Sequence, residues 1–178
     1  MDKKILIPLD GSETAETILP LVCMLASDAE SELILLHVVE YPCELYPVCR
    51  DDPPADPDLA EMKKRAVLCD RQAYLDEVSA RLTRLGYNVH TRICEGLVVE
   101  SIVDAAQYLD AHFIAVSTHG SGRYRREMTG SVANRVLHEA KTPVMVIVCP
   151  YQELFQIDPE MMRRAVFAEY PVKQDISS

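Results

Sequence analysis

Glycine, serine and threonine residues gather in one stretch of the chain, between an apolar run and a helix-like pattern. The apolar run covers residues 113–116 and is followed by Ser117-Thr118-His119-Gly120, nine further residues, and Gly130-Ser131-Val132. Glycine lets the backbone approach an anion closely, and the free amides and positive dipole end at a helix start attract negative charge. Ser131 can also cap the helix that comes next. The stretch therefore predicts a phosphate-binding loop.

Three arginines add positive charge inside the same stretch. Arg123, Arg125 and Arg126 lie between the two glycine positions, in a chain whose formal net charge is -10. A local positive field within an acidic protein suits a small polyanionic ligand. A solvated arginine-rich loop is the alternative, and the position beside the glycines favours the ligand-binding interpretation.

The glycine spacing excludes two common phosphate-binding motifs. G-x-x-x-x-G-K-[ST] is absent because no lysine follows Gly130, and Arg125 stands where G-x-G-x-x-G needs its third glycine. The spacing instead resembles the nucleotide motif of the universal stress protein family, G-x-x-G, nine residues, G-[ST]. Gly120, Gly130 and Ser131 match that motif, whereas Ser117 stands where the family has glycine.

The resemblance to this family extends over roughly residues 2–149. Residues 3–12 resemble its opening strand and turn, residues 33–39 its second strand, and residues 141–148 its last strand. Four separate matches in the same order make the resemblance specific.

The hydrophobic pattern alone predicts the same architecture. Apolar strand-like runs alternate with helical patterns, which is typical of right-handed βαβ crossovers and a parallel sheet. We expect a single doubly wound α/β domain over residues 1–150, with a five-stranded parallel sheet in the order 3-2-1-4-5 and helices on both faces. Residues 151–178 are expected to form a C-terminal extension with a short helix. Strands are expected at 5–9, 33–39, 89–93, 113–116 and 144–148, and helices at 13–26, 59–85, 98–109 and 131–140, the last with Val132, Val136 and Leu137 facing inward.

Ligands of such sheets bind beyond the carboxyl ends of the strands, where the strand order reverses. The family resemblance implies that the ligand is an adenine nucleotide, ATP with or without Mg²⁺. It places Asp10 in the nucleotide pocket, with Pro8 and Val38 beside the base and Val116 and Ser117 along the edge of the base. The expected nucleotide-binding residues are Pro8, Asp10, Val38, Val116, Ser117, Thr118, His119, Gly120, Arg123, Gly130, Ser131 and Val132.

Two of these positions leave alternatives open. Asp10 can cap the next helix, face the ligand, or do both. Ser117 weakens binding if its position needs a positive φ or a very close approach of backbone to ligand, because serine carries a Cβ that glycine lacks. With ordinary β geometry at the strand end, serine is tolerated.

No catalytic or metal-binding residue is expected. His119 is interpreted as an orienting histidine in a turn, since no nucleophile with a companion carboxylate lies near it in sequence. His37 lies on an apolar strand and is interpreted as a core or interface residue. The six cysteines contain no C-x-x-C pair, which argues against zinc. Cys43 and Cys49 could approach each other across a turn, but free thiols are favoured.

Composition limits the partners and the compartment. The net charge of -10 opposes binding to nucleic acid or to an anionic membrane. The first apolar run is interrupted by Pro8 and Asp10, unlike a secretory leader, and no apolar run is long enough to cross a bilayer. We therefore expect a cytoplasmic protein. The last strand is expected at a sheet edge, where the resemblance implies a homodimer.

Three functions are consistent with these observations. The first is an ATP-binding regulatory or stress-response protein with at most slow hydrolysis. The second is an interaction protein of the same fold that binds no nucleotide and contacts unknown protein partners through its dimer surface, the 40–58 loop and the tail. The third is a transferase or hydrolase of the adenine-nucleotide α-hydrolase type, for which only Asp10 and the arginines are candidates. We favour them in that order.

Overall fold

A five-stranded parallel sheet forms the centre of the molecule. The computed structural model describes residues 3–26, 31–41, 57–117 and 131–147. Within them the strand order is β3-β2-β1-β4-β5 and all pairings are parallel, which confirms the predicted topology. The strands are β1 (Lys3–Pro8), β2 (Ser31–Val39), β3 (Asn88–Glu95), β4 (Phe113–Ser117) and β5 (Val144–Ile147).

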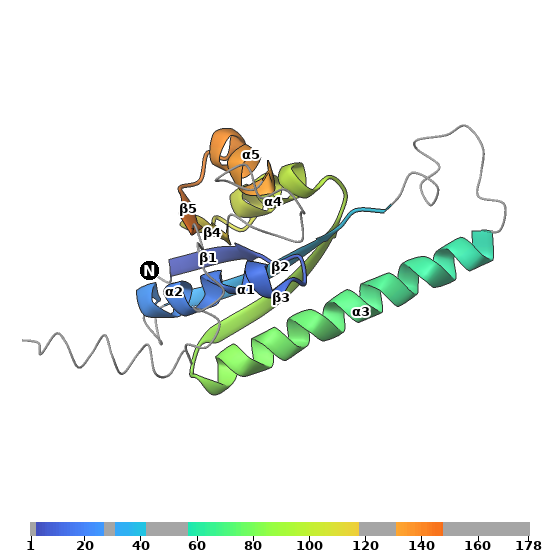
Figure 1. Cartoon of the computed structure of the whole chain (residues 1–178), viewed down its shortest axis with the longest axis horizontal. Coiled ribbons are helices and arrows are strands. Elements are labelled where there is room, and N and C mark those ends of the chain that lie inside the picture. The colour runs from blue at the N-terminus through green and yellow to red at the C-terminus, as the bar shows by residue number, and fades with distance from the viewer. Residues whose placement is uncertain (1–2, 27–30, 42–56, 118–130, 148–178) are drawn as a thin grey trace, which may run out of the picture.

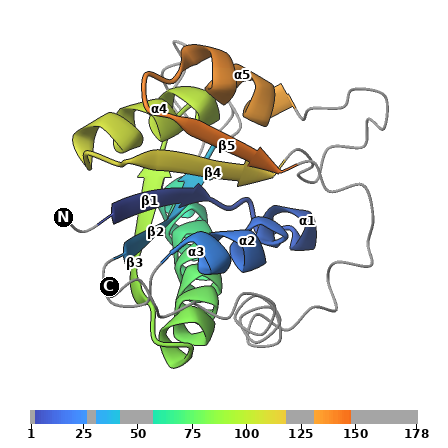
Figure 2. The same cartoon turned by 90° about the vertical axis from the view of Figure 1, so that its left-hand side faces the viewer.

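Helices cover both faces of this sheet (Figure 1 and Figure 2). One face packs against the first three helices, and the other against the last two. Two hydrophobic clusters result, one on each side of the strands. The helices are α1 (Glu13–Glu16), α2 (Ile18–Leu25), α3 (Pro57–Arg84), α4 (Val98–Tyr108) and α5 (Ser131–Glu139).

β1 contributes to both clusters. Ile5 and Ile7 pack on the side of α1, α2 and α3, whereas Leu6 packs on the side of α4 and α5. All three side chains are fully buried. Because successive side chains of a strand point to opposite faces, a strand covered on both faces has no polar side and its sequence is a continuous apolar run.

The first predicted helix is divided in two. Residues 13–26 were expected to form one helix, but α1 ends at Glu16 and α2 begins at Ile18, with Thr17 between them. Pro20 accounts for the break, because proline has no N–H to donate to the carbonyl of Glu16 and its ring crowds that carbonyl.

The predicted inward face of α5 is partly wrong. Val136 is buried as expected, but Val132 and Leu137 are 38% and 47% exposed. Ala133 is buried in their place, and Ala140 packs against the same cluster. Residues spaced by three and four share a helix face, so Ala133, Val136 and Ala140 form the inward stripe.

α3 is much longer than the other described helices. Its C-terminal half packs on the sheet through Leu75, Val78 and Leu82, while its N-terminal half extends past the sheet (Figure 1). Lys64 ties the extended half to β3 through an ion pair of 2.6 Å with Glu95. Gly86 comes just after the helix with a φ of 91°, the left-handed conformation typical of a glycine that ends a helix.

Some predicted features lie outside the described residues. These are most of the 40–58 loop with Cys43 and Cys49, and the 151–178 extension. Within the described part of the chain, Cys23, Cys69 and Cys94 are free thiols. No helix in that part is both long and apolar enough to span a bilayer.

Replacing Leu6 by alanine tests the central role of β1. Leu6 is fully buried, so Leu6→Ala should lower the free energy of unfolding by about 3 kcal/mol, because apolar contacts are lost and a cavity remains. Urea denaturation followed by circular dichroism measures this change. Met62→Ala is the control: Met62 is 68% exposed, and its replacement should change stability by less than about 0.5 kcal/mol. Equal effects of the two substitutions would contradict the assignment of β1 to the core.

Candidate functional site

The carboxyl ends of β1, β2 and β4 meet at one edge of the sheet. β1 pairs with β2 on one side and with β4 on the other, so this edge is where the strand order reverses. Pro8 ends β1 opposite Leu36, and Val38 lies two residues further along β2. Val116 and Ser117 end β4. The structure thus brings Pro8, Val38, Val116 and Ser117 to the same edge.

A turn stabilised by side chains comes after β1 at this edge. The Oδ1 atom of Asp10 accepts hydrogen bonds from the backbone N–H of Ser12 at 2.9 Å and from its Oγ at 2.6 Å. Ser12 Oγ in turn accepts from the N–H of Ala15 at 3.1 Å. Ser12 is therefore the N-cap of α1, and Asp10 holds the turn in shape. Gly11 has a φ of 85°, which explains why glycine stands there.

The backbone at Ser117 has ordinary strand geometry. Ser117 belongs to β4 and pairs in parallel register with Ile147 of β5. Among the described residues other than glycine, only Asp110 has a positive φ. Of the two alternatives for this position, the structure supports the one in which serine causes no backbone strain.

The first turn of α5 lies near the same edge. A helix that follows a strand in a right-handed crossover begins at the carboxyl end of that strand. Ser131 and Val132 are the first residues of α5, and both are exposed. Unpaired N–H groups at a helix start bind anions. The other predicted residues of this loop, which lie outside the described part of the chain, are Thr118, His119, Gly120, Arg123 and Gly130.

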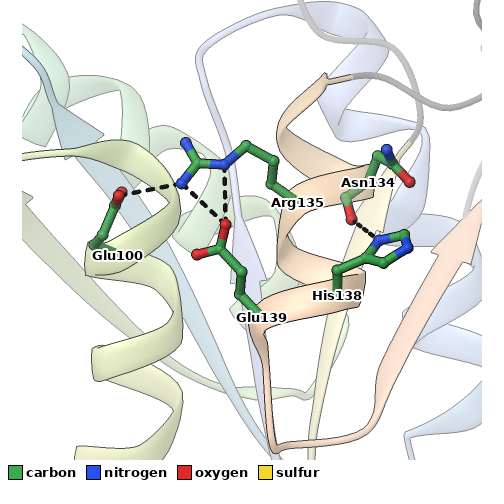
Figure 3. Close-up of polar contacts among 5 residues, drawn as sticks. All are labelled: Glu100, Asn134, Arg135, His138 and Glu139. Atoms are coloured by element: carbon green, nitrogen blue, oxygen red, sulfur yellow. Dashed lines mark hydrogen bonds and ion pairs between the residues drawn. The ribbon is translucent and has the colours of Figure 1, made fainter.

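Ion pairs on the outer surface hold α5 against α4 (Figure 3). Arg135 lies 3.2 Å from Glu100 of α4 and 3.0 Å from Glu139 of its own helix. Hydrogen bonds from the backbone of Glu100 and from Arg135 lower the pKa of Glu100 below its ordinary value. His138 Nδ1 donates to the carbonyl of Asn134 at 2.7 Å. These exposed pairs add little stability but orient α5, and with it the helix start.

His37 is buried among apolar residues of β2, as predicted for a core histidine. Its ring meets Tyr74 of α3 edge-on, with the ring centroids 6.4 Å apart. Burial and, to a smaller extent, the nearby guanidinium of Arg71 lower the pKa of His37 below its ordinary value of 6.5. Burial and the carboxylate of Glu16 raise the pKa of Tyr74.

One charged residue at this edge was missed by the sequence prediction. Arg71 of α3 reaches the turn after β1, and its Nη1 atom lies 3.6 Å from the point where a Cβ on Gly11 would stand. A signal was present in the sequence: Arg71 occupies an inward position of the helix, between Leu68 and Leu75 at spacings of three and four. A charged residue in an inward stripe suggests a specific partner.

Metal-binding groups were also sought in the described residues. In the part of the chain that the structure describes, no three His, Cys, Asp or Glu side chains lie close enough together to hold a metal ion.

Comparison with known proteins identifies the family. The fold is a doubly wound α/β domain whose strand order reverses at β1, the type of position at which such sheets bind ligands. The model of the universal stress protein family matches residues 1–148. The chain belongs to this family, which confirms the resemblance seen in the sequence.

Individual relatives agree with this assignment. Universal stress protein MJ0531 of Methanocaldococcus jannaschii is 29% identical over 85% of this chain and 85% of its own length. The solved structure of MJ0577, from the same organism, has a TM-score of 0.70 and 28% identity, over 83% of this chain and 96% of that one. A universal stress protein of Arabidopsis thaliana, solved with AMP bound, shares the fold at a TM-score of 0.60 and 15% identity, over 89% of this chain and 98% of that one.

The buried state of His37 predicts a pH-dependent stability. Because the folded-state pKa of His37 is lowered, the unfolded chain binds more protons than the folded chain just below pH 6.5. The contribution of neutral His37 to the free energy of unfolding is therefore fully present above pH 6.5. It is lost as the pH falls from 6.5 towards the lowered folded-state pKa. Urea denaturation at about pH 7.5 and about pH 5.5 should show a smaller loss of stability for His37→Gln than for the wild type.

Met62→Ala is the control for this measurement. The side chain of Met62 is exposed and carries no titratable group, so its replacement should leave the pH dependence of the wild type unchanged. If His37→Gln retains the full pH dependence of the wild type, His37 is not the group responsible.

Proposed function

We propose that this protein is an ATP-binding regulatory protein of the stress response, with at most slow ATP hydrolysis. One observation carries the proposal: the Asp10 turn, the end of β4 and the first turn of α5 belong to elements that meet at the switch point of the sheet. An acceptor at one side of this edge and the start of a helix at the other suit a base and a phosphate chain.

Two further points support an adenine nucleotide as the ligand. Ser117 has strand geometry, so its difference from the family motif does not require a strained backbone. A universal stress protein with the same fold holds AMP, although its sequence similarity to this chain is low. We therefore propose that this chain also binds an adenine nucleotide, and that the ligand is ATP, alone or with Mg²⁺.

A regulatory role is favoured over rapid catalysis. Phosphoryl transfer needs charges and usually a metal positioned around the reacting phosphate. Asp10 is a carboxylate at this edge, and its Oδ1 atom already accepts two hydrogen bonds from Ser12. A carboxylate held in this way is better suited to stabilising a turn and contacting a ligand than to transferring protons. We therefore propose that nucleotide occupancy, rather than turnover, carries the signal to unknown protein partners in the cytoplasm.

Calorimetric titration with ATP, ADP and AMP, with and without Mg²⁺, tests this function. The wild type should bind, and Asp10→Asn should bind about tenfold more weakly, because a charge-assisted contact is worth about 1.5 kcal/mol. Asparagine keeps an oxygen for Ser12, so the turn itself should survive. Asp104→Asn, an exposed change on α4, should bind like the wild type. A folded wild type that gives no heat and no thermal shift with millimolar nucleotide would instead favour the interaction protein without nucleotide.

We also propose a homodimer formed through β5. β5 is an edge strand of the described sheet and its residues are only partly buried. An apolar edge strand with free backbone groups is a site for pairing with a second copy. Multi-angle light scattering at micromolar protein should give about 40 kDa, twice the 20.0 kDa of one chain. A mass of one chain would exclude the dimer.

A further inference from the structure

The guanidinium of Arg71 lies over the turn after β1. Its Nη1 atom is 3.6 Å from the position of a Cβ on Gly11, the residue after Asp10. The same atom lies 3.4 Å from the carboxylate of Asp70, the preceding residue of α3. The side chain of Asp70 is exposed to solvent. The Arg71 side chain is 40% exposed. The guanidinium of Arg71 therefore lies at the carboxyl edge of the sheet and is partly open to solvent.

The position of α3 determines which part of a ligand Arg71 can meet. α3 packs against β2 and β3, on the face of the sheet opposite to α4 and α5. The helix start that suits phosphates belongs to α5 and lies on that other face. Arg71 is thus on the side of Asp10, and both residues act electrostatically on the ring of His37. This is the end of the site away from the proposed phosphates.

We propose that Arg71 is a ligand-binding residue of the nucleotide site, which donates a hydrogen bond from its guanidinium to N7 of the purine base beside Asp10. This inference rests on the proposed nucleotide binding. Adenine presents an exocyclic amine donor next to the ring acceptor N7. A carboxylate acceptor and a guanidinium donor at the same turn complement that pair. Guanine presents two acceptors at the same edge, and its O6 would face the carboxylate of Asp10, so Asp10 rather than Arg71 would disfavour guanine.

Calorimetry with ligands of increasing phosphate number tests this assignment. Adenosine, AMP and ATP are titrated into the wild type, Arg71→Ala and Arg71→Lys. Both variants should bind all three ligands about tenfold more weakly, by similar factors, because the lost contact is to the part that the ligands share. Lysine should not restore binding, since it lacks the planar donor fork of arginine. Arg65→Ala, an exposed change on the same helix, should bind like the wild type.

The stability of Arg71→Lys separates a ligand contact from a structural role, and the pKa of His37 checks where the guanidinium of Arg71 lies. Arg71→Lys keeps an aliphatic stem and a positive charge, so its unfolding midpoint without ligand should match that of the wild type. The pKa of His37, followed by NMR, should rise in Arg71→Ala, because removal of the guanidinium removes one cause of its lowering. A lower midpoint in Arg71→Lys that accounts for the weaker binding would overturn the proposal.

The remaining outcomes also decide between the two proposals. If the wild type binds and Arg71→Ala binds equally well, or if the loss grows with the number of phosphates, the assignment of Arg71 to the base is wrong while nucleotide binding stands. A wild type that binds none of the ligands refutes the proposed function itself.

Discussion

The burial of β1 on both faces, between β2 and β4, is the constraint on which the rest of the structure depends. Its side chains belong alternately to the two hydrophobic clusters, so β1 joins the layer of α1, α2 and α3 to the layer of α4 and α5. Because it is the strand at which the order of the sheet reverses, the connections on its two sides separate at its carboxyl end. The same pairing that fixes the core therefore creates the edge at which a ligand can bind.

The turn after β1 connects the buried core to the proposed binding edge. Gly11 adopts a backbone conformation that few residues tolerate, and Asp10 and Ser12 hold the turn through hydrogen bonds that end in the cap of α1. α3 reaches the same turn from the opposite direction and brings Arg71 to Gly11. A local segment and a distant helix thus meet at the same turn, which brings a carboxylate acceptor and a guanidinium donor to one edge of the sheet in a protein of net charge -10.

Strand order, helix positions and the family could be predicted from the sequence, because strands buried on both faces produce unbroken apolar runs and glycine spacing is a local property. Features that depend on packing could not. The break at Thr17 depends on one proline, and the inward stripe of α5 uses Ala133 where the larger Val132 was expected. The geometry of Ser117 needed its pairing with β5. Arg71 was missed because its partner turn is remote in sequence, and only its place in an apolar stripe signalled it.

A crystal structure of the protein with ATP tests the central claim most directly, because it locates the ligand relative to the sheet. The account predicts the nucleotide across the carboxyl ends of β1 and β4, with its base beside Asp10 and its phosphates at the first turn of α5. ATP bound elsewhere on the molecule, or this edge filled by the protein's own side chains with Ser131 turned away from it, would contradict the account.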